Sequence, residues 1–198
     1  MIITTTPTAP ERPYQVTGQV PGTAPAGPKR SKRPAVWVLG AAMVTTGLMA
    51  GLFYTYAVSV MLGLHRTDDR TFVLAMQRIN ESIQNAAFIP VFFGAFVLPA
   101  AAAVLHRRLG LRDATRWIVA ATILYGVALL VSFGINIPLN DQLDRAGDPD
   151  LISNLAAVRR DFEGPWVAWN IVRMLFSIGA LGCLGKALVL RGESPGRS

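Results

Sequence analysis

The sequence predicts an all-α protein, a bundle of four transmembrane helices with short amphipathic helices in its two outer loops. Hydrophobic residues make up 52% of the 198-residue chain and charged residues only 16%, which is too apolar for a disordered chain and unusually apolar for a soluble one. The apolar residues fall into four long runs, and the charge of the segments around these runs alternates between mainly basic and mixed or acidic. Together these three observations favour a multi-pass membrane protein.

Each of the four runs is long enough to cross a bilayer, which takes roughly 20 apolar residues. They cover residues 35–64, 86–105, 114–137 and 165–190. The first run has no charge and no proline and is apolar on all sides, and it is too long and begins too late to be the apolar core of a cleavable signal peptide. We therefore expect a membrane domain over residues 35–191, a disordered Pro/Thr/Gly-rich tail over residues 1–34, and a short tail over residues 192–198.

The charges predict the orientation of the helices. Basic residues dominate before the first run, between the second and third, and after the fourth: Lys29, Arg30, Lys32, Arg33, Arg107, Arg108, Arg112, Arg116, Arg191 and Arg197. The two longer connections, residues 65–85 and 139–164, contain most of the acidic residues. Because basic segments stay in the cytoplasm, we expect a cell-membrane protein with both termini cytoplasmic and both longer loops outside.

The net charge of +7 does not indicate a nucleic-acid partner. The basic residues flank the membrane spans and form no separate basic region, so orientation and contact with anionic lipid account for them. The expected partner is the lipid bilayer. Gly47 and Gly51 lie four residues apart and permit close helix contact, which serves packing within the chain or an oligomer.

Both outer loops contain helix signals. In the first loop, Thr67 or Asp68 can cap an amphipathic helix whose apolar face carries Phe72 and Met76. In the second, Asp148 and Pro149 can begin another short helix. We expect Pro138 to end the third membrane helix and Pro165 to open the fourth.

Polar side chains converge at the outer end of the predicted bundle. Burial of polar groups within a membrane is costly, so a cluster of them there indicates a functional site. Arg173 lies about 12 Å beyond Pro165 at ~1.5 Å per residue, inside the outer leaflet, so it should face the bundle and bond to neighbouring polar groups. The other members of the predicted cluster are His65, Gln77, Asn80, Asn136, Asn140, Asp141, Trp166, Trp169 and Asn170. Two interpretations stay open: a ligand or catalytic pocket, and a structural polar plug that holds the helices together.

Metal and cofactor sites are not expected. The single cysteine, Cys183, excludes a disulfide within the chain and a thiolate-built zinc site. The two histidines, His65 and His106, lie on opposite sides of the membrane in this topology and cannot share a metal. The sequence contains no phosphate-binding or dinucleotide-binding glycine motif.

Four stretches resemble the anthrone oxygenase-like family of small four-helix membrane proteins, most of which have no known function. They are residues 51–64, residues 72–80, the Asn-x-Pro-x-Asn element that begins at Asn136, and the Trp-x-x-Trp-Asn-x-x-Arg element that ends at Arg173. The resemblance covers roughly residues 38–190. Leu62 stands where the family usually has proline.

The resemblance implies, for some fungal members, oxidation of a polyketide anthrone to an anthraquinone without a cofactor. In such chemistry His65 or Asp141 would act as the base, and Arg173 with Asn136, Asn140 and Asn170 would stabilise the enolate oxygen. Trp166 and Trp169 would stack on the flat rings. The alternative is a non-enzymatic membrane protein that binds or moves a lipophilic aromatic compound, or an assembly factor.

Overall fold

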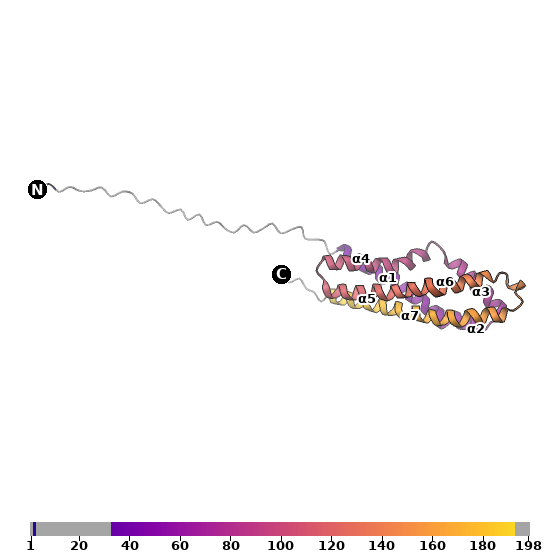
Figure 1. The fold of residues 1–198 in the computed structure, drawn as a ribbon. Helices are drawn as coiled ribbons and strands as arrows, with labels where there is room; N and C mark the ends of the chain where they lie inside the picture. Colours follow the sequence, from indigo (N-terminus) through magenta and orange to yellow (C-terminus); the bar gives the residue numbers. More distant parts are fainter. Residues whose placement is uncertain (1, 3–32, 193–198) are drawn as a thin grey trace. The chain divides into compact units, whose positions relative to one another are not determined.

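The structure, a computed structural model, describes Ile2 and residues 33–192, so the tails expected over residues 1–34 and 192–198 lie almost entirely outside the described residues. Within these residues every regular element is a helix (Figure 1): α1 (Arg33–Thr55), η1 (Tyr56–Val60), α2 (Met61–His65), α3 (Asp69–Ile83), α4 (Phe88–Arg108), α5 (Arg112–Val131), η2 (Ser132–Asn136), α6 (Ile137–Arg145), η3 (Pro149–Leu151) and α7 (Leu155–Gly192). The all-α fold is confirmed.

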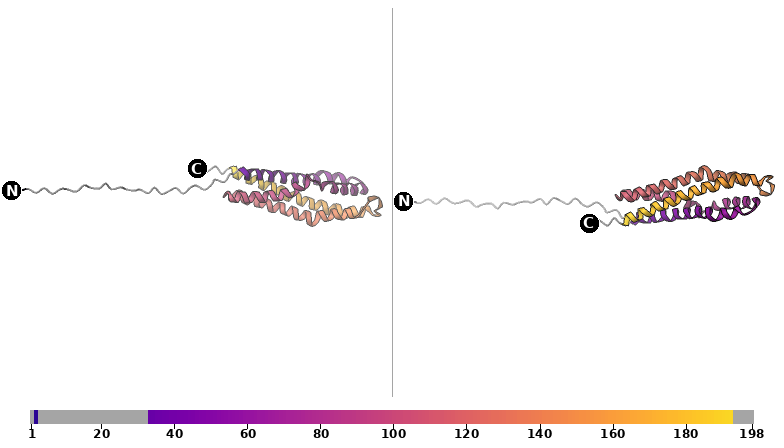
Figure 2. Two further views of the ribbon diagram at one scale, coloured as in Figure 1. Left: turned by 90° about the horizontal axis from the view of Figure 1, so that it is seen from above. Right: turned by 90° about the horizontal axis from the view of Figure 1, so that it is seen from below.

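Four continuous helical segments are long and apolar enough to cross a membrane: Arg33–His65, Phe88–Arg108, Arg112–Arg145 and Leu155–Gly192. Each contains most of one predicted apolar run, so the protein is a multi-pass membrane protein. The segments run alongside one another (Figure 2), and α1 packs against α4 and α7 while α5 packs against the same two helices. The bundle therefore has the cyclic order α1, α4, α5, α7.

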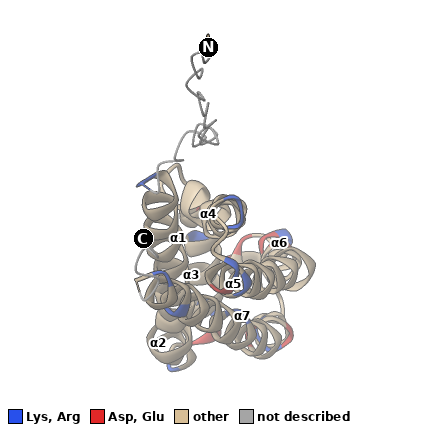
Figure 3. Cartoon of the chain, turned by 90° about the vertical axis from the view of Figure 1, so that its left-hand side faces the viewer, with Lys and Arg blue, Asp and Glu red and all other residues tan. Residues whose placement is uncertain are grey.

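The two ends of the bundle differ in charge. We call the end with Arg33, Gly192 and the turn between α4 and α5 the terminal end, and the opposite end, with α3, α6 and η3, the loop end. Figure 3 looks along the bundle from the terminal end, where the blue segments of α4 and α5 mark Lys and Arg.

In the α4–α5 turn, Gly110 has a φ of +75°, a conformation that glycine adopts without strain.

The core of the bundle is built largely from alanines. Ala42, Ala95, Ala121 and Ala180 are fully buried, one on each of the four long helices. Small side chains let helix backbones approach closely, which is the main source of helix association in lipid, where apolar burial itself gains little. Gly47 faces Leu181 of α7, whereas a Cβ at Gly51 would meet nothing within 4 Å, so only the first of these glycines packs against another helix of the chain.

Two π-helical turns, η1 and η2, interrupt the first and third membrane segments near the loop end. The prediction that the third helix ends at Pro138 is wrong, because η2 leads directly into α6. In a regular α-helix the Pro138 ring would clash with the carbonyl of Gly134. The wider π turn relieves this contact, so the helix continues past the proline to Arg145.

The prediction that Pro165 opens the fourth helix is also wrong. Asp148 caps η3 through the backbone N–H of Asp150, as its sequence position suggested, but η3 is only three residues long. The helix expected in the second loop is instead the first part of α7, which begins at Leu155 and runs through Pro165 without interruption. Packing of Phe162 and Trp166 against α2 and α3 holds the chain helical on both sides of the proline.

The predicted amphipathic helix of the first loop is confirmed as α3. The Asp68 carboxylate accepts a bond from the backbone N–H of Thr71 and so caps it. Phe72 and Met76 are fully buried against α6 and α7, so α3 closes the loop end of the bundle rather than lying free on the membrane surface. The Gln77 amide adds two bonds of 3.0 Å to the carbonyls of Leu143 and Gly147.

An exposed ion pair joins α3 to η3. Arg70 Nη2 donates to Asp150 Oδ2 at 2.8 Å, and this partner lowers the pKa of the Asp150 carboxyl. The ion pair therefore stabilises the position of η3 fully at pH values above the ordinary carboxyl pKa. This stabilisation is lost as the pH falls through the lowered pKa of Asp150.

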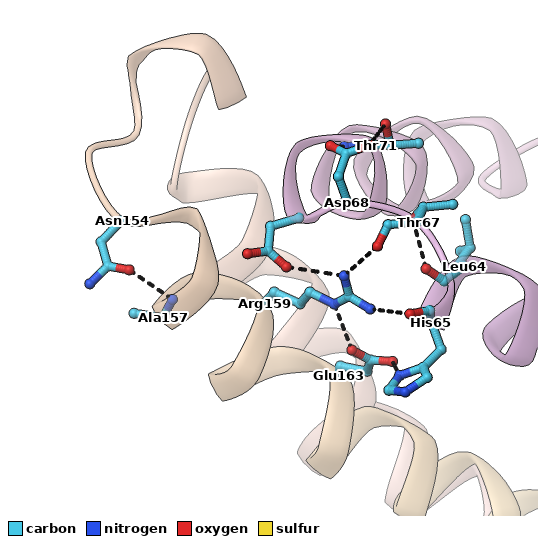
Figure 4. Close-up of polar contacts among 10 residues, drawn as sticks. Leu64, His65, Thr67, Asp68, Thr71, Asn154, Ala157, Arg159 and Glu163 are labelled. Carbon is cyan, nitrogen blue, oxygen red and sulfur yellow. Dashed lines mark hydrogen bonds and ion pairs between the residues drawn. The ribbon is translucent and has the colours of Figure 1, made fainter.

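A buried guanidinium fastens α2 and α3 to α7. Arg159 donates to the carbonyls of His65 and Thr67, each at 2.8 Å, and pairs with Asp69 at 3.0 Å and with Glu163 at 2.8 Å (Figure 4). Glu163 also bonds His65 Nδ1 at 2.7 Å. The bonds of Arg159 thus join α7 to α2, to α3 and to the turn between them.

Replacement of Arg159 by alanine should destabilise the protein by about 2–4 kcal/mol, since it strands a buried Glu163 and two carbonyls. The neighbouring Arg160→Ala variant is the matched control, because Arg160 is 75% exposed and, among residues 33–192, forms an ion pair only with Asp161. Thermal unfolding in detergent checks both variants. Equal unfolding temperatures for the two would show that the network is not structurally important.

Candidate functional site

A cavity of about 310 Å³ lies at the loop end between the four long helices. Its walls come from α1 and η1, from the end of α3 and the start of α4, from η2 and α6, and from α7. The lining is mostly aromatic and aliphatic, with a few convergent polar groups, which is the usual composition of a small-molecule site.

Arg173 is the basic group of this cavity. Its side chain is buried, and the guanidinium carbon lies 4.5 Å from the ring centre of Phe53 and 5.4 Å from that of Trp166. Nη2 donates to Asn170 Oδ1 at 3.1 Å and Nη1 to Ser132 Oγ at 3.4 Å, while Nε is buried without a partner. The bond to Ser132 is long and Nε has no bond, so the donors are only partly satisfied.

No carboxylate of the described residues forms an ion pair with Arg173. A guanidinium at this depth costs about 2.5–3.5 kcal/mol on insertion scales when nothing compensates it. The two aromatic rings recover part of this cost through cation–π attraction, which reaches about 2 kcal/mol for a desolvated cation, but they do not neutralise the charge. The site therefore retains positive potential toward the cavity.

Two asparagines hold the walls of the cavity in place. Asn170 Nδ2 donates to the carbonyl of Phe53 at 2.9 Å, which ties α7 to α1, and its Oδ1 accepts from Arg173. Asn136 Nδ2 donates to the carbonyl of Trp166 at 3.2 Å, which ties η2 to α7. Asn136 Oδ1 is buried without a partner.

Trp166 forms an aromatic wall. Its indole N–H donates to Asn140 Oδ1 at 2.8 Å, which fixes the ring against α6. The ring of Tyr56 packs against it with a centroid separation of 5.4 Å. Both rings line the cavity, as does Phe53. A flat ligand would therefore contact these aromatic surfaces and also the Arg173 guanidinium.

The mouth of the cavity at the loop end is polar. It is bordered by Asn80, Gln84, Asn140 and Asp141. Asn80 is 4% exposed and its Nδ2 donor has no partner, although its side chain lines the cavity. Asp141 is exposed and is the only carboxylate among the lining residues of the described chain.

The structure brings together most of the residues singled out in the sequence. Six line the cavity, and Asn136 lies directly behind its wall: Asn80, Asn140, Asp141, Trp166, Asn170, Arg173 and Asn136. Three others do not line it. His65 is exposed and bonds Glu163, Gln77 bonds the carbonyls of Leu143 in α6 and of Gly147 after it, and Trp169 is 39% exposed on the outer surface of α7.

Sequence reasoning missed the aromatic residues and the hydroxyl group of the site. Tyr56 and Ser132 reach it because η1 and η2 are π turns, which re-aim side chains and are frequent at functional sites. Phe88, Phe92 and Phe133 complete the walls. The sequence signal available for Tyr56 was its place in the 51–64 stretch; a phenylalanine in an apolar run carries no such signal.

The arrangement favours one kind of chemistry. An uncompensated guanidinium with amide donors beside it stabilises an oxyanion or enolate better in a water-poor site than in solution. The aromatic walls accept a flat apolar body, and Asp141 offers a carboxylate at the mouth. The site is therefore suited to bind an aromatic compound whose oxygen carries, or develops, negative charge.

The geometry predicts that Arg173 is not needed for stability. The Arg173→Leu variant should keep or raise the unfolding temperature in detergent, because an unpaired buried charge is replaced by an apolar side chain of similar volume. The Asn170→Leu variant should instead lower stability by about 1–3 kcal/mol, because it leaves the Phe53 carbonyl unsatisfied. If Arg173→Leu unfolds as readily as Asn170→Leu, the cluster is a structural plug.

One protein family matches this chain. The family model described as anthrone oxygenase matches residues 85–183, half of the chain, and this range contains Asn136, Asn140, Asp141, Trp166, Asn170 and Arg173. The stretches 51–64 and 72–80, which carry Tyr56 and Asn80, lie outside the matched range. No curated protein and no solved structure matches the chain. The chain belongs to the anthrone oxygenase family.

Proposed function

We propose that this protein binds a polycyclic aromatic substrate of the polyketide type in the cavity and oxygenates it without a cofactor. The observation that carries the proposal is the buried Arg173 guanidinium, which faces an aromatic-walled cavity with no carboxylate partner among the described residues. Membership of the anthrone oxygenase family supports the choice of substrate class and of reaction.

The proposed reaction begins with removal of a proton from the acidic methylene carbon of an anthrone. Asp141 is the base that fits, because it borders the cavity, whereas His65 does not. The negative charge moves onto the ring oxygen, where Arg173 and the amides of Asn170 and Asn80 stabilise it.

The carbanion then supplies the electrons that reduce O₂. A C–O bond forms, and protonation gives a hydroperoxide at the former methylene carbon. Loss of the remaining C–H proton and cleavage of the O–O bond yield the quinone carbonyl and one molecule of water. One anthrone and one O₂ thus give one anthraquinone and one water, and no external reductant is required.

Purified protein in detergent should accelerate O₂ uptake with 1,8-dihydroxyanthrone. The Asp141→Asn variant should lower this rate by about 10²-fold or more, the usual contribution of a general base. Asp144→Asn is the matched control, one helical turn further along α6 and outside the cavity lining, and should keep the rate.

The Arg173→Met variant should abolish the acceleration while the protein stays folded. Recovery of the anthrone unchanged from a protein that binds it would support binding or transport instead of catalysis. Loss of activity in His65→Gln but not in Asp141→Asn would contradict the assignment of the base.

We also propose that the protein lies in the cell membrane with the loop end and the cavity mouth outside. The support is the basic residues of the terminal end, of which Arg107, Arg108 and Arg112 flank the α4–α5 turn. Alkaline phosphatase fused behind Ser198 should be inactive and the same fusion behind Gly147 active, because this reporter works only outside the cytoplasm. The reverse pattern would contradict the orientation.

A further inference from the structure

The cavity borders the surface of the bundle on two chemically different sides. At the loop end the exposed lining residues are Gln84 and Asp141, which are polar. Within the membrane segments they are Ile89, Phe93 and Phe133, which are 46%, 45% and 51% exposed. These three side chains therefore separate the cavity from the lipid. Each has one face toward the cavity and the other toward the lipid.

The helices diverge at this position. In the described chain α4 packs extensively against α1 and α5 but at most weakly against η2 and α6. Between α4 and η2 the wall is made by side chains alone. The rings of Phe93 and Phe133 meet there at 6.2 Å, and the ring of Phe92 lies 6.1 Å from that of Phe133.

This wall is easier to open than the rest of the cavity. The other walls are held by directional bonds, such as those from Asn136 to Trp166 and from Tyr125 to the carbonyl of Phe92 at 3.0 Å. Phe93 and Phe133 have no polar group, and half of each ring contacts lipid, so rotation of either side chain breaks only weak contacts. Such rotations take place within nanoseconds at exposed positions.

We propose that Phe93 and Phe133 form a lateral portal through which a bilayer-dissolved ligand enters the cavity. The proposal rests on the binding of an aromatic ligand proposed above and adds where that ligand comes from. A lipophilic aromatic compound is concentrated in the bilayer, so it reaches Arg173 without passing the polar mouth. Its polar end then lies on the guanidinium while its apolar end is still between the two phenylalanines.

The test blocks either entrance with a removable adduct. In a Cys183→Ala background, Phe133→Cys is labelled with benzyl methanethiosulfonate, which adds a ring at the portal and is removed by a reductant. The protein is placed in lipid nanodiscs and mixed with vesicles that contain 1,8-dihydroxyanthraquinone. Binding is followed as quenching of Trp166 fluorescence, with Trp37, Trp117 and Trp169 replaced by phenylalanine.

Two matched variants receive the same adduct. Phe96→Cys lies on the same helix as Phe93, but Phe96 packs over Gly126 and does not line the cavity. Gln84→Cys lies at the polar mouth. We expect the adduct at position 133 to abolish rapid quenching and the reductant to restore it, whereas the adduct at position 96 leaves quenching unchanged and the adduct at position 84 reduces it less than the adduct at position 133.

The possible results separate the two proposals. Quenching that is lost with the adduct at position 84 and kept with the adduct at position 133 would overturn the portal while leaving ligand binding intact. Equal loss with the adduct at position 96 would also overturn it, since the effect would then not be local. Absence of quenching in the unlabelled protein would overturn ligand binding itself, and the portal with it.

Discussion

The site depends on one uncompensated charge. A guanidinium within a membrane bundle is unfavourable unless it gains partners, and Arg173 gains one ordinary hydrogen bond to Asn170, one long bond to Ser132 and two aromatic faces, without a carboxylate among the described residues. The surrounding polar groups are arranged around this charge: Asn170 accepts from it and at the same time ties α7 to α1. The cost of placing the arginine there is consistent with a role toward a ligand, because a charge that served packing would be paired.

A second arginine shows the contrast. Arg159 is also largely buried, yet it is bonded to two carbonyls and two carboxylates at 2.8–3.0 Å. It fastens the short helices of the loop end to α7 and so closes the bundle above the cavity. The two arginines lie four helical turns apart on one helix, and the difference in their partners distinguishes a structural cation from one that is available to a ligand.

The two π turns connect fold and site. Each adds a residue to a turn of a membrane-spanning helix, which changes the direction of the side chains that follow. In η1 this brings Tyr56 against Trp166, and in η2 it brings Ser132 to Arg173 and leaves Phe133 at the lipid boundary. The same irregularity accommodates Pro138, so one local feature serves both continuity of the helix and the shape of the cavity.

The sequence alone determined the membrane-spanning segments, because the length and apolarity of a run are local properties that lipid selects directly. It also indicated the Asp68 cap and the polar members of the site, since polar groups in apolar runs are conspicuous. Arg173 faces the bundle as its sequence position predicted, but only the tertiary structure decided which of the other candidate side chains reach the cavity. Rotation of α7 about its axis turns Asn170 and Arg173 inward and Trp169 outward, and packing against α2 and α3 keeps that helix continuous through Pro165. The separation of His65 from Asp141, and the phenylalanines that close the cavity toward lipid, likewise follow from contacts between segments far apart in the chain, which no local pattern encodes.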